Sequence, residues 1–141
     1  MRISDVSSSI YKLLYETLEV PFGIRVVENA SFIDFAVYDK WIAIDSLTHT
    51  TGSIPRALYF FHVANKDTGP NDIRDLNRLT DKVLDIVNQG ARFNVYNDLD
   101  GTLIGEMEVS ETSLSPVIKH PEGGNYRSLT VGLVYAGETP T

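Results

Sequence analysis

The residue types that most often carry chemistry occur in this chain, but their spacing forms no known catalytic or metal-binding motif. The three histidines, His49, His62 and His120, stand far apart, and no two of them have the spacing of a helical metal-ligand pair. No serine lies in a GxSxG sequence, and no phosphate-binding GxxxxGK[ST] loop occurs. The chain has no cysteine, which excludes thiolate metal sites, disulfides and cysteine nucleophiles. We therefore expect no catalytic residues, no metal, no cofactor and no enzymatic activity.

One acidic sequence, DLDGTL at Asp98–Leu103, has the form of a reactive motif. It follows the apolar run Phe93–Tyr96 and resembles the first motif of haloacid dehalogenase-type phosphatases, which implies an aspartate nucleophile, an aspartate acid or base and magnesium. That family places the motif near the start of a larger doubly wound domain, whereas only 38 residues follow here, with Lys119 as their sole lysine. We favour a simple turn at Asn97–Gly101, because Asn, Asp and Gly tolerate turn backbone angles. The phosphatase stays an unfavoured alternative.

The composition indicates one folded domain over residues 1–141. Of these residues 43% are apolar and 22% charged, unlike a disordered chain. Nineteen acidic and twelve basic side chains give a net charge of −7, so we expect phosphate backbones to be repelled and no specific nucleic acid to bind. No apolar run approaches the ~20 residues that span a bilayer, and we expect a soluble, unsecreted protein that binds no membrane.

The first segment predicts an amphipathic helix. We expect Ser4 to cap it and the helix to end near Glu19, because Pro21 disfavours helical backbone at the residue before it. The apolar residues that recur at helical spacing are Val6, Ile10, Leu13, Leu14 and Leu18. They predict one buried stripe.

Strand-like segments follow this helix. Ile24–Val27 and Ser31–Tyr38 are rich in apolar and aromatic residues. Along Trp41–Leu47 successive residues alternate between two sets, as the two faces of a strand require. Arg56–Ala64 is almost continuously apolar, which is typical of a central strand covered on both faces. Between the last two lies Thr48–Pro55, whose hydroxyls, glycine and proline favour an exposed hairpin tip. We expect that tip to be the leading contact surface.

A second amphipathic helix is predicted at Asp72–Gln89. Asn71 or Asp72 can cap it, and Gly90 can end it. Its predicted buried face consists of Ile73, Leu76, Leu79, Val83, Ile86 and Val87. The opposite face carries mixed charges, which are typical of a solvated surface.

Three further strands complete the prediction. They are Ala91–Tyr96, Leu103–Val109 and Tyr126–Tyr135, and Ser110–Asn125 is expected to be at least partly a long loop, because it contains two prolines and a pair of glycines. The sequence therefore predicts an α+β fold, in which two α-helices pack on a largely antiparallel β-sheet with a long β-hairpin and extended loops.

The order of these elements resembles that of the tail terminator, or tail-completion, proteins of long-tailed bacteriophages. The similarity covers nearly the whole chain and includes the local sequences IPRALYFFHVANKD at 54–67 and TVGLVYAGE at 130–138. The resemblance implies a structural virion protein that forms a homohexameric ring, caps the head-proximal end of the tail tube, ends its polymerisation and offers a docking face to the head-tail connector. It implies the tube protein and the connector as partners, and a location in the virion tail and, during assembly, in the host cytoplasm.

Two segments are candidate contact surfaces by this analogy. They contain Thr48, His49, Thr50, Thr51, Ser53, Ile54 and Pro55 in the hairpin tip, and Ser115, Pro116, Lys119 and His120 in the late loop. Another small neck or tail-tube component, or a cellular ligand-binding domain of similar topology, remains an alternative.

Overall fold

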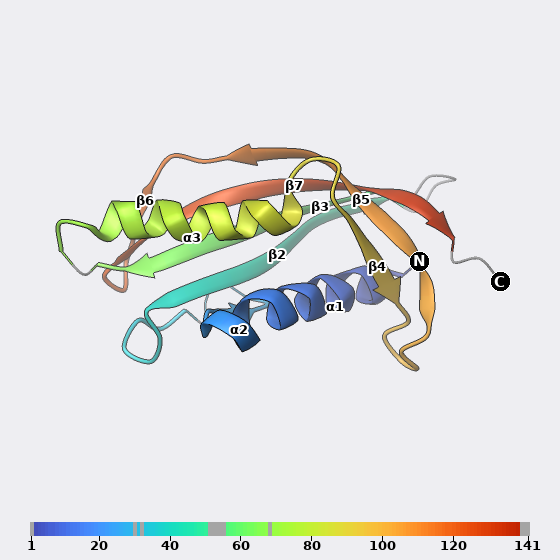
Figure 1. Cartoon of the computed structure of the whole chain (residues 1–141), viewed down its shortest axis with the longest axis horizontal. Coiled ribbons are helices and arrows are strands. Elements are labelled where there is room, and N and C mark those ends of the chain that lie inside the picture. Colours follow the sequence, from blue (N-terminus) through green and yellow to red (C-terminus); the bar gives the residue numbers. More distant parts are fainter. Residues whose placement is uncertain (1, 30, 32, 51–55, 68, 139–141) are drawn as a thin grey trace.

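A single curled sheet and two helical segments make up the part of the chain that the computed structural model describes, residues 2–29, 31, 33–50, 56–67 and 69–138 (Figure 1). The helices are α1 (Ile3–Leu14), which continues as a π-helical turn (Tyr15–Glu19) and α2 (Val20–Phe22), and α3 (Asp72–Val87). The strands are β1 (Arg25–Val27), β2 (Lys40–Thr50), β3 (Arg56–Lys66), β4 (Arg92–Tyr96), β5 (Leu103–Leu114), β6 (Ile118–His120) and β7 (Gly124–Glu138). The predicted α+β fold is confirmed. None of the described helices has the length and apolarity to cross a membrane.

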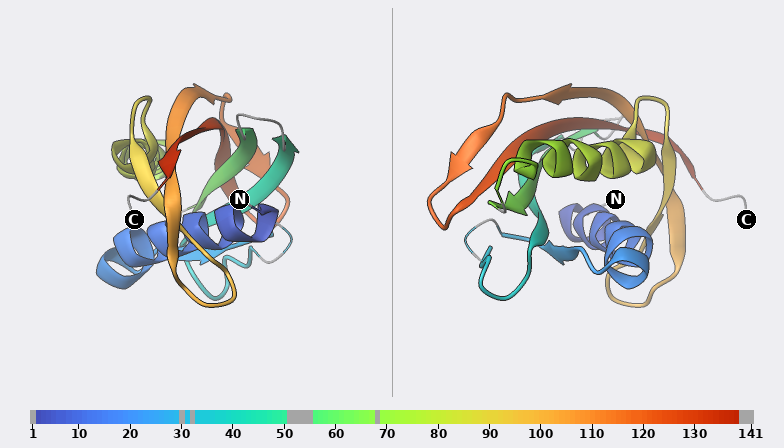
Figure 2. Two further views of the ribbon diagram at one scale, coloured as in Figure 1. Left: turned by 90° about the vertical axis from the view of Figure 1, so that its right-hand side faces the viewer. Right: turned by 60° about the vertical axis from the view of Figure 1, so that its left-hand side comes forward.

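The strands are ordered β1-β2-β3-β7-β5-β4, and β6 pairs with β7 beyond the end of β5. Every pairing is antiparallel except that of β1 with β2. The prediction that β3 is central is therefore confirmed, because β2 and β7 flank it. The sheet bends around α1 and α3, which lie on its inner face (Figure 2).

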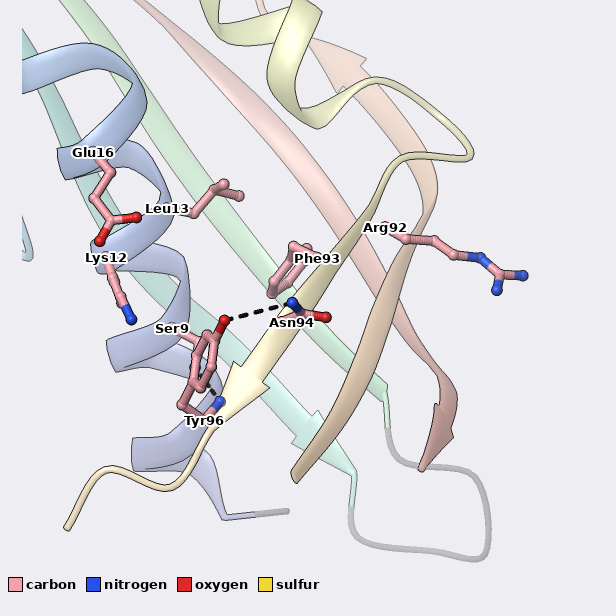
Figure 3. A pocket seen from close by; sticks show the side chains of 8 residues that line it. All are labelled: Ser9, Lys12, Leu13, Glu16, Arg92, Phe93, Asn94 and Tyr96. Atoms are coloured by element: carbon pink, nitrogen blue, oxygen red, sulfur yellow. Dashed lines mark hydrogen bonds between the residues drawn. The ribbon is translucent and has the colours of Figure 1, made fainter. Parts of the chain in front are cut away.

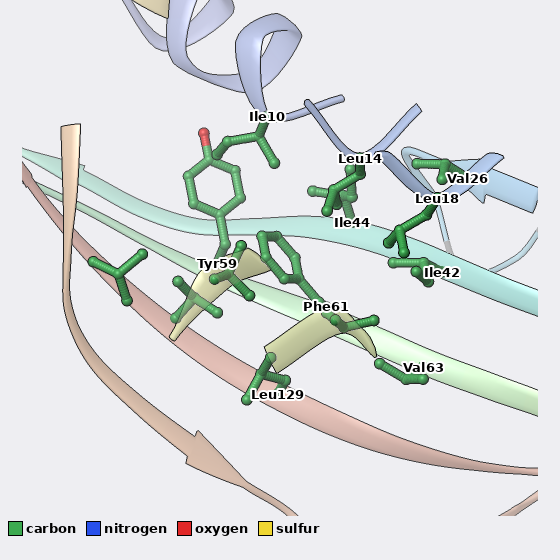
Figure 4. Packing of buried hydrophobic residues seen from close by; sticks show 14 of the residues in the cluster. Ile10, Leu14, Leu18, Val26, Ile42, Ile44, Tyr59, Phe61, Val63 and Leu129 are labelled. Atoms are coloured by element: carbon green, nitrogen blue, oxygen red, sulfur yellow. The ribbon is translucent and has the colours of Figure 1, made fainter. Parts of the chain in front are cut away.

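The inner face holds the main core. Side chains of α1 and α3 pack there on alternate residues of β3, among them Tyr59, Phe61 and Val63, which are 0–1% exposed (Figure 4). A second, smaller cluster lies on the outer face, where Trp41, Ala43 and Ala64 pack against the Ile33 and Phe35 side chains. The helices therefore cover the inner face, and the segment with Ile33 and Phe35 covers part of the outer face.

The first helix extends past both predicted ends. Ser4 is not its cap, since Arg2 precedes the first turn and donates its backbone N–H to Asp5 Oδ2 at 3.0 Å. The helix also passes Pro21, because the π-helical turn bonds Val20 N to Tyr15 O and the missing proline N–H falls in the last turn. Gly23, at φ 68°, ends it. The predicted stripe is confirmed, with Leu13 only half-buried.

The strand predicted at Ser31–Tyr38 is wrong. The described part of this segment contains a turn at 35–37, in which Asp34 accepts from Ala36 N with its side chain (2.9 Å) and from Val37 N with its carbonyl (3.1 Å). An aspartate that binds its own neighbouring backbone competes with strand pairing. The apolar pattern reflects burial in the outer cluster.

The second helix agrees with its predicted stripe except at one position. Leu76, Leu79 and Val83 are buried, whereas Ile73, in the first turn, is 40% exposed. Neither predicted cap binds the first turn in the usual way, since Asn71 makes no side-chain cap bond and Asp72 accepts instead from its neighbour Ile73 N.

The long loop predicted at Ser110–Asn125 is also wrong. Strand β5 continues to Leu114 after a bulge near Val109, and Ile118–His120 pairs with β7. The two prolines fall at Pro116 and Pro121, just outside the paired residues, so neither removes a ladder hydrogen bond.

Candidate functional site

The first predicted contact segment is mostly strand where the structure describes it. Thr48 and Thr50 are exposed residues of β2, paired with β3, and Thr50 Oγ1 accepts from Arg56 N at 3.1 Å. Thr51, Ser53, Ile54 and Pro55 lie outside the described residues. The end of the β2–β3 hairpin therefore offers hydroxyl groups on a paired, regular backbone.

His49 does not lie in an exposed loop. A bulge between Ser46 and Thr48 places its half-buried ring toward Tyr59, where Nε2 lies 3.0 Å from the Tyr59 hydroxyl and 2.9 Å from Ser46 Oγ. Burial lowers the pKa of His49, and burial also raises the pKa of Tyr59. The Tyr59 hydroxyl also lies 2.9 Å from Ser7 Oγ, so these hydrogen bonds join the hairpin end to α1.

The second predicted contact segment is held by the sheet. Ser115 exchanges hydrogen bonds with Ser128: its N donates to Ser128 O at 3.0 Å, and its Oγ accepts from Ser128 N at 2.8 Å. Pro116 and Lys119 are exposed, and Lys119 Nζ lies 3.0 Å from Asp67 Oδ2. That partner lowers the pKa of Asp67.

His120 lies on β6 rather than in a loop. Its ring makes edge contacts with Phe35 and Tyr126, at centroid distances of 5.3 and 5.9 Å. Its Nδ1 accepts from Glu122 N at 3.0 Å. With Ile33, His62, Pro121 and Tyr126 it lines a cavity of about 150 Å³ on the outer face.

The structure places the hairpin segment and the β6 residues Lys119 and His120 at opposite ends of the central strands, whereas Ser115 bonds Ser128, which pairs with His62 in the interior of β3. Thr50 pairs with Arg56 at one end of β3, and Lys66, at the other end, pairs with Gly124 of the strand that carries β6. Eleven residues of β3 span roughly 33 Å at about 3.3 Å per residue. The hairpin end and the β6 end therefore face opposite directions (Figure 1).

A cavity of about 280 Å³ between α1 and the edge strand β4 was missed by the sequence analysis (Figure 3). Ser9 Oγ accepts from Tyr96 N at 2.9 Å, and Lys12 Nζ lies 4.2 Å from the Tyr96 ring centroid. Because successive strand residues point to alternate sides, the backbone groups of Arg92 and Asn94 face the same open edge as Tyr96 N. This edge can accept hydrogen bonds from an extended chain.

Asp5 lies beside the end of the same edge, where β4 leads into the β4–β5 turn. Its Oδ1 accepts from Asp98 N at 2.9 Å and its Oδ2 from Arg2 N at 3.0 Å. Burial raises the pKa of Asp5, but these backbone N–H groups outweigh burial and hold the pKa below its ordinary value. The helix start and the β4–β5 turn are thereby tied together.

The DLDGTL motif forms the predicted turn. Asp100 Oδ1 accepts from Thr102 N and Thr102 Oγ1, which lowers the pKa of Asp100, and Gly101 adopts φ 74°. In the described ranges no group of three or more His, Asp or Glu side chains could hold a metal ion. Nothing described there gathers the further acidic ligands that a phosphatase of the resembled family needs.

A hydrogen-bonded row of serine, histidine and aspartate crosses three strands of the outer face. His62 Nδ1 lies 2.8 Å from Ser128 Oγ, and His62 Nε2 lies 2.7 Å from Asp45 Oδ2. In the tautomer with hydrogen on Nε2, Asp45 orients the ring and Nδ1 can accept the serine proton. His62 is half-buried on the outer face and is not part of the main core.

No sequence signal identifies this row in advance. The three residues are 17 and 66 positions apart, and only the strand register brings them together. Comparison with protein-family models and with curated proteins finds no match to this chain.

Proposed function

We propose that this protein is a structural virion protein that forms a ring at the head-proximal end of a phage tail tube. In this proposal the homohexameric ring ends tube polymerisation and provides the docking face for the head-tail connector, as a tail terminator does. Its partners are other copies of itself, the tube protein and the connector, in the tail and in the host cytoplasm during assembly.

The observation that carries the proposal is the separation of the two contact segments. A stack of identical rings grows as long as its terminal face offers the same surface, so a protein that ends growth must present two different surfaces in opposite directions. The hairpin end presents the hydroxyl groups of Thr48 and Thr50, and the β6 end presents the Lys119–Asp67 pair. The roughly 33 Å of β3 between these ends separates two chemically different surfaces.

The mass of the protein in solution and the length of its partner's tubes test this proposal together. Light scattering coupled to size exclusion should give about 94 kDa, six times the 15.7 kDa chain, and images should show six-fold rings. Added to polymerising tube protein, the ring should stop elongation at one end. Tubes that keep growing with the protein incorporated along their length would instead indicate a tube component.

A second candidate function rests on one observation, the Ser128–His62–Asp45 row. Ser128 Oγ would attack an ester carbonyl and pass its proton to His62 Nδ1, the protonated ring would give that proton to the leaving alcohol as the ester C–O bond breaks, and water would then release the acyl group. A fluorophosphonate probe should label Ser128 in this case. Labelling should be lost in Ser128→Ala and kept in Ser113→Ala, a matched exposed strand serine. Absence of labelling in the wild type would eliminate this function.

A further inference from the structure

The β4–β5 turn is a rigid projection with an apolar tip. Leu99 is 81% exposed, the largest exposed fraction among the described large apolar side chains. Asp98 and Asp100 flank it, and we refer to these three residues as the acidic knob. Asn97 Oδ1 accepts from Leu99 N at 2.8 Å and from Asp100 N at 3.2 Å.

The acidic knob is anchored to the rest of the molecule as well as to itself. Asp98 N donates to the buried Asp5 Oδ1 of α1, and Asn97 N donates to Thr102 O at 2.8 Å. A surface whose backbone is already fixed loses little conformational entropy when it binds a partner. The Asp98 carboxylate has no ionic partner in the described chain.

A complementary surface lies at the other end of the same helical segment. Val20 and Phe22 are 66% and 58% exposed, and Lys82 Nζ of α3 lies 4.1 Å from the Phe22 ring centroid. We refer to these three residues as the basic patch. Lys82 forms no ion pair within the described residues, although Asp85 lies one turn further along α3 and Arg78 one turn before it, paired with Asp75.

We propose that the acidic knob of one copy docks on the basic patch of a second copy of this chain. The knob offers an apolar side chain between carboxylates. The patch offers apolar side chains beside the Lys82 ammonium group, which lies over the Phe22 ring and forms no ion pair with the described residues, so both the apolar surface and the charge are complementary. This inference rests on the proposed ring and names the contact that builds it.

The positions of the two surfaces fit head-to-tail assembly. They are tied to opposite ends of the continuous helical segment from Asp5 to Phe22, about 25 Å apart at 1.5 Å per residue (Figure 1). Two different surfaces on one molecule make a heterologous contact, in which each copy uses its knob on one neighbour and its patch on the other. Such contacts produce closed rings or filaments, and a self-complementary dimer contact does not.

The direct test uses two variants that each remove one half of the contact. The knob variant is Asp98→Ser/Leu99→Ser, and the patch variant is Phe22→Ser/Lys82→Ser; all four side chains are exposed, so both variants should fold. Each variant alone should have a mass near 15.7 kDa by light scattering, at concentrations where the wild type is a ring. A matched control, Val37→Ser/Asp39→Lys, alters exposed residues elsewhere and should assemble as the wild type does.

Mixing the two variants gives the decisive result. One intact knob and one intact patch remain between them, so an equimolar mixture should form a heterodimer of about 31 kDa and nothing larger. Rings formed by either variant alone, or a mixture that stays monomeric, would overturn the inference, and so would a wild type that is monomeric throughout. A ring-forming wild type with ring-forming variants would overturn the contact and leave the proposed function intact. Failure of the wild type to stop tube growth would instead count against the function.

Discussion

The two faces of the sheet differ in what their residues do, although they alternate along the same strands. On β3, Tyr59, Phe61 and Val63 point inward and are buried under the helices, whereas Phe60 and His62 point outward and are half-buried. The side chains of the inner face are buried in core packing. The outer face keeps polar and aromatic groups such as His62 and Phe60 partly exposed, so the two faces of one strand differ in how much of each side chain is buried.

The largest expected effect contrasts two adjacent phenylalanines. Phe61→Ala removes a fully buried ring from the main core and should lower the free energy of unfolding by about 3–5 kcal/mol. Phe60→Ala, on the outer face, should cost about 1 kcal/mol because its ring is half-exposed. Urea unfolding of both variants measures the difference. Equal losses would show that the outer face is packed as tightly as the inner one.

The next contrast concerns two carboxylates at the same turn. Asp5→Ala leaves the backbone N–H groups of Arg2 and Asp98 without their acceptor and should cost about 1–3 kcal/mol. Asp100→Ala, in which the lost carboxylate is exposed, should cost less stability than Asp5→Ala. Thermal unfolding of both variants checks the order, which would be contradicted if Asp100 mattered more.

The pH dependence of stability should reveal the carboxylate of Asp5. Its pKa in the folded state lies below the ordinary 3.8, so the unfolded chain binds the proton more readily. The stabilisation is complete above the unfolded pKa and is lost as pH falls through the folded pKa. Asp5→Asn should therefore show a weaker loss of stability below about pH 4 than the wild type. Parallel curves for the two proteins would contradict this assignment.

His49 should make the stability of the fold depend on pH in a higher range than Asp5 does. Burial lowers its folded pKa from 6.5, so the folded state favours the neutral ring while the unfolded chain accepts a proton. Stability should be constant above about pH 6.5 and fall below it, with the slope reduced in His49→Gln. NMR titration of the ring gives the pKa directly, and a value above 6.5 would overturn the explanation.

The sequence predicted the parts of the fold that depend on local pattern. The stripe of the first helix and the central position of β3 follow from spacing and apolar content, and both are confirmed. Two errors have a common cause, because the prolines at Pro21, Pro116 and Pro121 predict breaks that a π-helical turn and strand pairing accommodate. The error at Ser31–Tyr38 has another cause, the turn that Asp34 forms with its own neighbouring backbone.

The candidate sites were less predictable because they depend on register. The 280 Å³ cavity beside β4 and the Ser128–His62–Asp45 row require knowledge of which strands are neighbours. A one-residue change of register would move each of these side chains to the other face. Neither length nor spacing in a single sequence fixes that register.

The most direct test of the account is the position of labels on the assembled ring. Because the chain has no cysteine, Thr48→Cys and Lys119→Cys each create one reactive site, the first at the hairpin end and the second on β6. Both side chains are exposed, so a maleimide-linked gold particle can reach either one. In side views by electron microscopy, we expect the two labels on opposite faces of a six-fold ring. Labels on the same face, or no ring, would contradict the claim that this protein joins two different partners through opposite ends of its central strands.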